Sequence, residues 1–177
     1  KDWQVNAFCN GLIALVLTKI DPQSTKALTL IRRHVNELVE LDIPPYQVAG
    51  EEGTGKEANP EFEQWSIANG LSSAPEAIYW LGSMTQNFTT LKMIRDAKSI
   101  PHLLKGLESR QVSIVAGSAS ALIAIDARRY KSEILDSAER IGLSKSTRST
   151  MEDVLLETED QEFREHIRPY FKNDARF

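Results

Sequence analysis

The sequence predicts an all-α fold, a single domain over residues 1–177 in which about eight or nine helices form an irregular multi-helix bundle. Apolar residues recur at spacings of three and four along most of the chain, which is the period of one helix face. Capping residues followed closely by proline separate these segments and mark helix starts. Sustained alternation with a period of two, the signal of a half-buried strand, is almost absent.

The first two predicted helices lie on either side of Asp21-Pro22. From Trp3 to Thr18 the apolar residues fall on one helix face, and Asp21-Pro22 ends this helix. The same pair starts the next helix, because aspartate accepts hydrogen bonds from free backbone N–H groups and proline has no N–H to leave unpaired. The second helix is predicted to bury a stripe formed by Ala27, Leu28, Ile31, Val35, Leu38 and Val39.

A flexible loop is predicted over residues 43–59. The segment begins with Ile43-Pro-Pro-Tyr, combines glycine with charge, and shows no periodicity. Asn59-Pro60 then starts a short helix over Phe62 to Asn69, and Ser73-Ala-Pro75 starts another that includes Ile78 to Leu81. A further amphipathic helix is expected from Phe88 to about Ala97.

The second half of the chain continues the helical pattern. Ser99 and Pro101 start a short helix, and the segment from Val112 to Asp126 is small and apolar nearly all round, so other helices must enclose it. Further helices are predicted over Ser132 to Ile141, with Gly142 as C-cap, and from the cap Ser144 through Leu156. A charged helix from Glu162 to Tyr170 is the last.

Residues 99–141, SIPHLLKGLESRQVSIVAGSASALIAIDARRYKSEILDSAERI, resemble a HEAT or armadillo-type helical repeat. The resemblance lies in a first helix with Ile100, Leu103, Leu104 and Leu107 and a second helix with Val112, Ala116, Ala119, Leu122 and Ile125. The segment departs from the family where an aspartate in the turn and an early arginine in the second helix are usual. The resemblance implies a short HEAT-like α-solenoid as the alternative architecture, and protein binding through a packed helical face.

Composition narrows the function classes. The net charge of −4 disfavours a general nucleic-acid binder, which needs clustered Lys and Arg on its phosphate-binding face. Cys9 is the single cysteine, so no internal disulfide can form, and we expect a cytoplasmic protein with a processed exported protein as the alternative. The charge-free stretches 3–18 and 111–125 fall short of the ~20 apolar residues of a membrane-spanning helix, so no membrane partner is expected.

Several motifs imitate catalytic or cofactor sites but lack a required residue. Gly50 to Lys56 almost matches the phosphate-binding loop, yet Glu57 stands where a hydroxyl should hold magnesium. His34, His102 and His166 show no metal-ligand spacing and are expected at helix surfaces or caps. Gly117-Ser118-Ala-Ser120 lacks the serine-nucleophile pattern and lies within a predicted helix. The sequence therefore predicts no catalytic residue, no metal site and no cofactor.

Ser137 to Met151 resembles a DNA-reading helix-turn-helix. Ala138 would pack inward, Gly142 would lie at the turn, and Ser144 would open the reading helix. The pattern fails at Arg148, where an apolar residue should pack one helix on the other. As the alternative function we therefore keep a DNA-binding regulator that would contact DNA through Lys145, Ser146, Thr147 and Arg148.

The leading hypothesis is a non-enzymatic protein-interaction module of the adaptor, chaperone-like or inhibitor type. Its partner would be another protein with a basic surface, because electrostatic steering favours such a partner for an acidic segment. A homo-oligomer and an enzyme with an unrecognised site remain open. The contact would use the loop from Pro44 to Asn59 or the acidic residues Glu152, Asp153, Glu157, Glu159, Asp160 and Glu162.

Overall fold

The computed structural model describes residues 24–46 and 59–141, together with residues 16, 21, 161, 165 and 168, and this part of the chain is helical without strands. The all-α prediction is confirmed there. No helix within these residues has both the length and the apolarity needed to span a bilayer. The elements are α2 (Thr25–Glu40), α3 (Pro60–Ala68), α4 (Ala74–Ile94), the 3₁₀-helix η1 (Ala97–Ser99), α5 (Ile100–Leu107) and α6 (Val112–Ile141).

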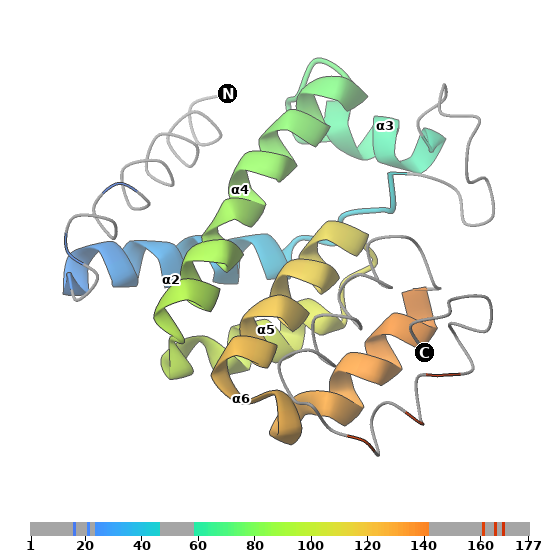
Figure 1. Cartoon of the computed structure of the whole chain (residues 1–177). Helices are drawn as coiled ribbons and strands as arrows, with labels where there is room; N and C mark the ends of the chain where they lie inside the picture. Colours follow the sequence, from blue (N-terminus) through green and yellow to red (C-terminus); the bar gives the residue numbers. More distant parts are fainter. Residues whose placement is uncertain are drawn as a thin grey trace.

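The helices pack around one hydrophobic core. α4 and the first half of α6 lie side by side, α5 packs on α6, and α2 packs on both α4 and α5 (Figure 1). α3 packs against the first part of α4. Every helix contributes to the core, whose largest fully buried side chains are Ile31, Leu38, Ile43, Phe62, Phe88, Leu91, Leu103, Ile114, Leu122 and Ile134.

The start of α2 differs from the prediction. Ser24, not Asp21, is the N-cap, and its hydroxyl accepts a hydrogen bond from the Ala27 N–H at 3.5 Å. Asp21 lies one turn earlier, where its carbonyl accepts a hydrogen bond from the Ser24 N–H at 3.0 Å. The predicted apolar stripe is buried, apart from Leu28, which is half-buried.

The starts of α3 and α4 are confirmed, but α4 is longer than predicted. Asn59 accepts a hydrogen bond from the Glu61 N–H at 3.0 Å, and Ser73 accepts one from the Glu76 N–H at 3.3 Å. α4 then continues through Gly82 to Ile94, so the two helices expected here are one. A glycine costs a helix about 1 kcal/mol, which the buried face of α4 outweighs by packing on its neighbours.

α6 consists of two helical halves separated by a kink at Asp126, where the sequence predicted one helix to end before the next. Asp126 has an extended backbone conformation, with φ −163° and ψ 88°, and its carboxylate accepts a hydrogen bond from the Arg129 N–H at 3.2 Å. The second half then turns back, and the Arg140 guanidinium donates hydrogen bonds to the carbonyls of Leu107 and Ser109. Every residue of 111–125 is buried or half-buried, as its apolar composition predicted. The described residues thus form five α-helices, fewer than the eight or nine predicted for the whole chain, and separate helices were wrongly expected on the two sides of Gly82.

The first residues of the predicted flexible loop are fixed in the structure. Ile43 is 1% exposed, and the Pro44 carbonyl accepts a hydrogen bond from the Gln111 side chain at 3.3 Å. Asn59 donates from its backbone to the Tyr46 carbonyl at 2.9 Å and from its side chain to the Pro45 carbonyl at 3.0 Å. These bonds hold positions 46 and 59 together, and residues 47–58 lie outside the described part of the chain.

Candidate functional site

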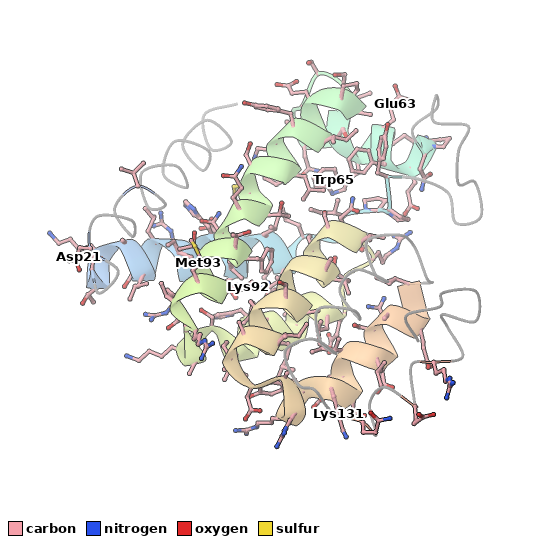
Figure 2. All side chains as sticks on the ribbon, viewed as in Figure 1. Asp21, Glu63, Trp65, Lys92, Met93 and Lys131 are labelled. Carbon is pink, nitrogen blue, oxygen red and sulfur yellow. The ribbon has the colours of Figure 1, made fainter. Side chains whose placement is uncertain are left out.

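A row of aromatic rings fixes α3 against α4. Tyr46 meets Phe62 edge-on with ring centroids 5.5 Å apart, and Phe62 stacks on Trp65 at 5.9 Å. Trp65 in turn lies 6.3 Å from Trp80 on α4. Figure 2 shows Trp65 between α3 and the neighbouring helices. Aromatic pairs at these distances stabilise beyond their buried area, so the α3–α4 corner is a rigid support for the surface above it.

The surface on this support is the solvent-facing side of α4, which we call the α4 face. Its exposed residues recur every three or four positions, as expected for one helix face. No charged residue lies between Glu76 and Lys92, so the middle of the face is uncharged. The α4 face consists of Pro75, Ile78, Tyr79, Gly82, Gln86, Thr89 and Met93.

Exposed apolar side chains gather on the same two helices. Tyr79 is 71% exposed and Met93 59% exposed, and Ile67 at the end of α3 is 61% exposed. Within the described residues, every large hydrophobic side chain that is exposed belongs to α3 or α4, with the exception of Val16. Apolar surface patches mark interaction sites in monomeric proteins, and these are the large exposed apolar side chains that α3 and α4 offer for one.

Gly82 lies near the middle of the α4 face. A Cβ atom added at Gly82 would meet nothing within 4 Å, in contrast to Gly106 and Gly117, which are packed against α6 and α4 side chains. Gly82 therefore has no packing role among the described residues. It leaves the helix backbone open to close approach from outside.

The described residues do not bring catalytic groups together. His34 was expected at a helix surface, but it is 1% exposed, and burial lowers its pKa against the smaller opposing effect of Glu37. Ser118 is fully buried within α6, which removes it as a nucleophile. No group of three or more histidine, cysteine, aspartate or glutamate residues in the described part is arranged to hold a metal ion.

An open depression lies on the outer side of α2. It has a volume of about 300 Å³ and is lined by Thr25, Lys26, Thr29, Leu30 and Arg33. All of these residues come from one helix, and the lining contains no carboxylate, histidine or cysteine. It therefore supplies no acid–base pair for catalysis.

The residues predicted to bind a partner fall outside this region. Lys145, Ser146, Thr147 and Arg148, the acidic residues from Glu152 to Glu162, and the glycine-rich segment from Gly50 to Lys56 lie outside the described residues. Glu165, at the end of the acidic segment, pairs with Arg168 at 3.3 Å. Ser137, at the start of the helix-turn-helix resemblance, is buried, and its hydroxyl donates a hydrogen bond to the Ile134 carbonyl at 2.7 Å.

The α4 face was missed by the sequence analysis. Residues 74–94 were predicted as two helices, so the exposed residues of the α4 face, which lie on both sides of Gly82, were not recognised as one helix face. The uncharged run between Glu76 and Lys92 was the available signal, since solvated helix faces usually carry charge. Comparison of the chain with protein-family models, curated proteins and solved structures gives no match.

Proposed function

We propose that this chain is a protein-binding helical module and that the α4 face, extended by Ile67, is its docking surface. The proposal rests on one observation, the exposed apolar side chains of α3 and α4 beside a stretch of α4 that carries no charge between Glu76 and Lys92. The central part of protein interfaces is depleted in charge and enriched in Tyr and Met. A surface of this composition suits an apolar stripe of a partner helix that docks along α4.

Tyr79 is the residue expected to dominate binding. It is the most exposed of these side chains, and a tyrosine combines a large apolar ring with a hydroxyl at low conformational cost. The aromatic row beneath α3 and α4 holds the surrounding backbone in place before binding. A preformed surface loses less entropy on association than one that must order first.

A HEAT-like α-solenoid is the more specific architecture that we propose for this module. It is supported by the α5–α6 pair, in which a Cβ added at Gly106 would lie 2.1 Å from the Ser118 hydroxyl. Such close stacking of paired helices is typical of helical repeats. The irregular bundle is the competing architecture. In both, the α4 face is open to a partner.

Two predictions from the sequence remain beside the α4 face: a second protein contact through the acidic segment, and DNA binding as the alternative function. A basic partner would reach the acidic residues from Glu152 to Glu162 by electrostatic steering. DNA binding would depend on Lys145 and Arg148, so their reversal to glutamate would abolish a gel shift at physiological salt.

A site-specific cross-linker tests the docking surface directly. A photoreactive phenylalanine analogue is placed at position 79 and, as the matched control, at Glu133, which is exposed on α6. After irradiation in cells of the native source, position 79 is expected to capture one protein that position 133 does not. Capture of nothing, or of the same set of proteins from both positions, would contradict the proposal.

Substitution of the same residue then measures its contribution. Once the captured protein is purified, Tyr79→Ala is expected to weaken its binding by about tenfold or more, as for the central tyrosine of an interface. Glu133→Ala, which also truncates an exposed side chain, is expected to leave the affinity unchanged. Titration calorimetry of the two variants and the wild type gives the comparison.

A further inference from the structure

The basic side chains of the described helices are unevenly distributed. Residues 24–46 carry three basic and three acidic side chains, and residues 59–141 carry nine of each, so this part of the chain is neutral as a whole. Positive charge nevertheless accumulates where α4 ends and where α6 bends. We call this surface the basic end, and it consists of Lys92, Arg95, Lys98, Arg128 and Arg129.

Packing places these two segments at the same end of the bundle. A short turn joins α5 to α6, so the two helices run in opposite directions, and Gly106 lies against Ser118. The first residue of α5 therefore lies beside Ala124 along the axis of α6. On the other side, Phe88 of α4 lies against Gly117, and both helices run in the same direction (Figure 1). The end of α4 is therefore level with the bend at Asp126. Figure 2 labels Lys92 and Met93 on the last turns of α4 and Lys131 beyond the bend.

Four of the five cations of the basic end lack an ion pair with a described residue, whereas several cations elsewhere have one, and the fifth, Arg129, lies 5.4 Å over the Tyr130 ring. At the opposite end of α5, Lys105 pairs with Glu40 at 2.5 Å, and Arg110 pairs with Glu61 at 2.7 Å. Lys92, Arg95, Lys98 and Arg128 make no ion pair with any residue that the structure describes.

Of the two nearby carboxylates, Asp96 is neutralised by a residue outside the basic end, and Asp126 offsets one of the five cations. Asp96 is already held by Arg32, whose guanidinium donates to both of its oxygens at 2.6 and 2.7 Å. The Asp126 carboxylate caps the second half of α6. Unneutralised cations on one surface create a local positive potential even in a chain of net negative charge.

We propose that the basic end binds the anionic headgroups of a phospholipid membrane as a peripheral contact. Clusters of four to eight Lys and Arg residues bind acidic lipid surfaces. Met93, which is 59% exposed beside Lys92, would enter the boundary between headgroups and acyl chains. The expectation of no membrane partner was based on the lack of a membrane-spanning stretch, and a peripheral contact needs none.

Nucleic acid is the less suitable polyanion. Binding to single strands uses aromatic side chains on which bases stack. The exposed aromatic residue of the described part is Tyr79, which lies on the first half of α4, away from the basic end. An apolar side chain such as Met93 gains from lipid but not from a row of phosphates. Met93 is the one residue that both proposals use, and none of the cations of the basic end belongs to the α4 face, so the two proposals stand or fall separately.

Vesicle co-sedimentation tests this inference with the full chain. The protein is expected to bind phosphatidylcholine vesicles that contain phosphatidylserine, not to bind vesicles of phosphatidylcholine alone, and to dissociate as salt is raised. Soluble phosphoserine at the same total concentration should not release it, because a single headgroup lacks the multivalent surface. Failure to bind the acidic vesicles would overturn the proposal.

Matched double substitutions locate the contact. Lys98→Gln with Arg128→Gln is expected to lower the partition coefficient by about 30-fold, since each cation near an acidic surface contributes about fivefold. Lys105→Gln with Arg110→Gln removes the same charge from the opposite end and should lower it much less. Met93→Ser should weaken binding without changing its salt dependence. A membrane contact at this end would be contradicted if the two double variants lost vesicle binding equally. It would also be contradicted if the protein bound DNA or RNA oligonucleotides more tightly than vesicles at the same salt.

Discussion

His34 is enclosed within the helices although its imidazole is polar. The side chain is 1% exposed, and its Nδ1 atom has no hydrogen-bond partner. Because burial disfavours the charged ring, the pKa of His34 lies below its ordinary value of 6.5, with a smaller opposing effect from Glu37 and a further lowering by Arg33. The folded protein therefore holds this histidine in its neutral form.

Acidification is expected to destabilise the fold through His34. Below pH 6.5 the unfolded chain binds a proton at this residue while the folded protein still excludes it, so the free energy of unfolding falls as the pH falls toward the lower folded pKa. Above pH 6.5 the contribution is fully present. Urea denaturation of the wild type and of His34→Leu between pH 7.5 and pH 5 measures it, and the variant should lose less stability over this range.

Two comparisons make this result specific. Asp96 and Glu61 also have lowered pKa values, but their ordinary values of 3.8 and 4.5 place their effect at lower pH. His102 is half-buried rather than enclosed, so His102→Leu should retain the acid sensitivity of the wild type. An identical pH dependence for His34→Leu and the wild type would show that the buried imidazole does not control it.

Asn87 shows how burial changes the meaning of a residue pattern. Asn87-Phe-Thr89 reads as a glycosylation triplet in the sequence. Asn87 is 3% exposed, and its amide donates to the Met84 carbonyl at 2.8 Å. The Asn87 side chain, which would carry the glycan, is therefore inaccessible in the folded protein.

At the scale of the elements, the close approach of α4 and α6 depends on Gly117. A Cβ added at this position would lie 2.8 Å from the Phe88 ring, which is closer than real Cβ contacts. Gly117→Ala is therefore expected to separate the helices and to lower the free energy of unfolding by about 1–3 kcal/mol. Gly82→Ala is the matched control, because open space surrounds Gly82, and it should stabilise the helix by about 0.5–1 kcal/mol.

A second substitution separates crowding from helix propensity. Phe88→Leu makes room beside Gly117, so the double variant with Gly117→Ala should cost less than the sum of the two single changes. Thermal or urea denaturation of the four proteins gives this coupling. Strict additivity would mean that Gly117 does not owe its role to contact with the Phe88 ring.

Helix starts could be predicted from the sequence, whereas helix continuity could not. A start depends on local chemistry, which is why Asn59-Pro60 and Ser73 with Pro75 mark the true beginnings of α3 and α4. Continuity of α4 through Gly82 depends on burial against distant helices, which local sequence does not contain. The bend at Asp126 and the burial of His34 are tertiary outcomes of the same kind.

The same distinction explains the candidate site. Exposure of Ile67 and Tyr79 follows from how α3 and α4 pack, so apolar residues that looked like core material lie on the surface instead. The uncharged stretch of α4 was visible in the sequence, but its stripe required the helix to be read as one element. The placement of Lys98 and Arg128 at the same end of the bundle likewise requires the packing of α5 on α6.

At the scale of the whole molecule, two bidentate ion pairs join segments far apart in the chain. Arg32 of α2 holds Asp96 in the turn after α4, and Arg110 in the turn after α5 holds Glu61 of α3. The pairs differ in their surroundings. Partial burial acts to raise the pKa of Asp96, but the hydrogen bonds from Arg32 and Ser99 outweigh it, so the pKa is lowered. Arg110 and Glu61 form their pair in solvent.

This difference predicts unequal costs for the same kind of change. Asp96→Asn leaves the partly buried Arg32 without its carboxylate, and we expect it to lower the free energy of unfolding by about 2 kcal/mol. Breaking a fully buried pair costs about 3–5 kcal/mol, and the cost is smaller here because the Arg32 side chain is partly exposed to solvent. Glu61→Gln should cost clearly less, since water and salt screen an exposed pair. Urea denaturation at neutral pH compares the two variants, and a double cycle with Arg32→Gln isolates the Arg32–Asp96 coupling. If Glu61→Gln proved the more costly change, the attachment of α3 through Arg110, rather than that of α2 through Asp96, would be the contact on which the assembly of these helices depends.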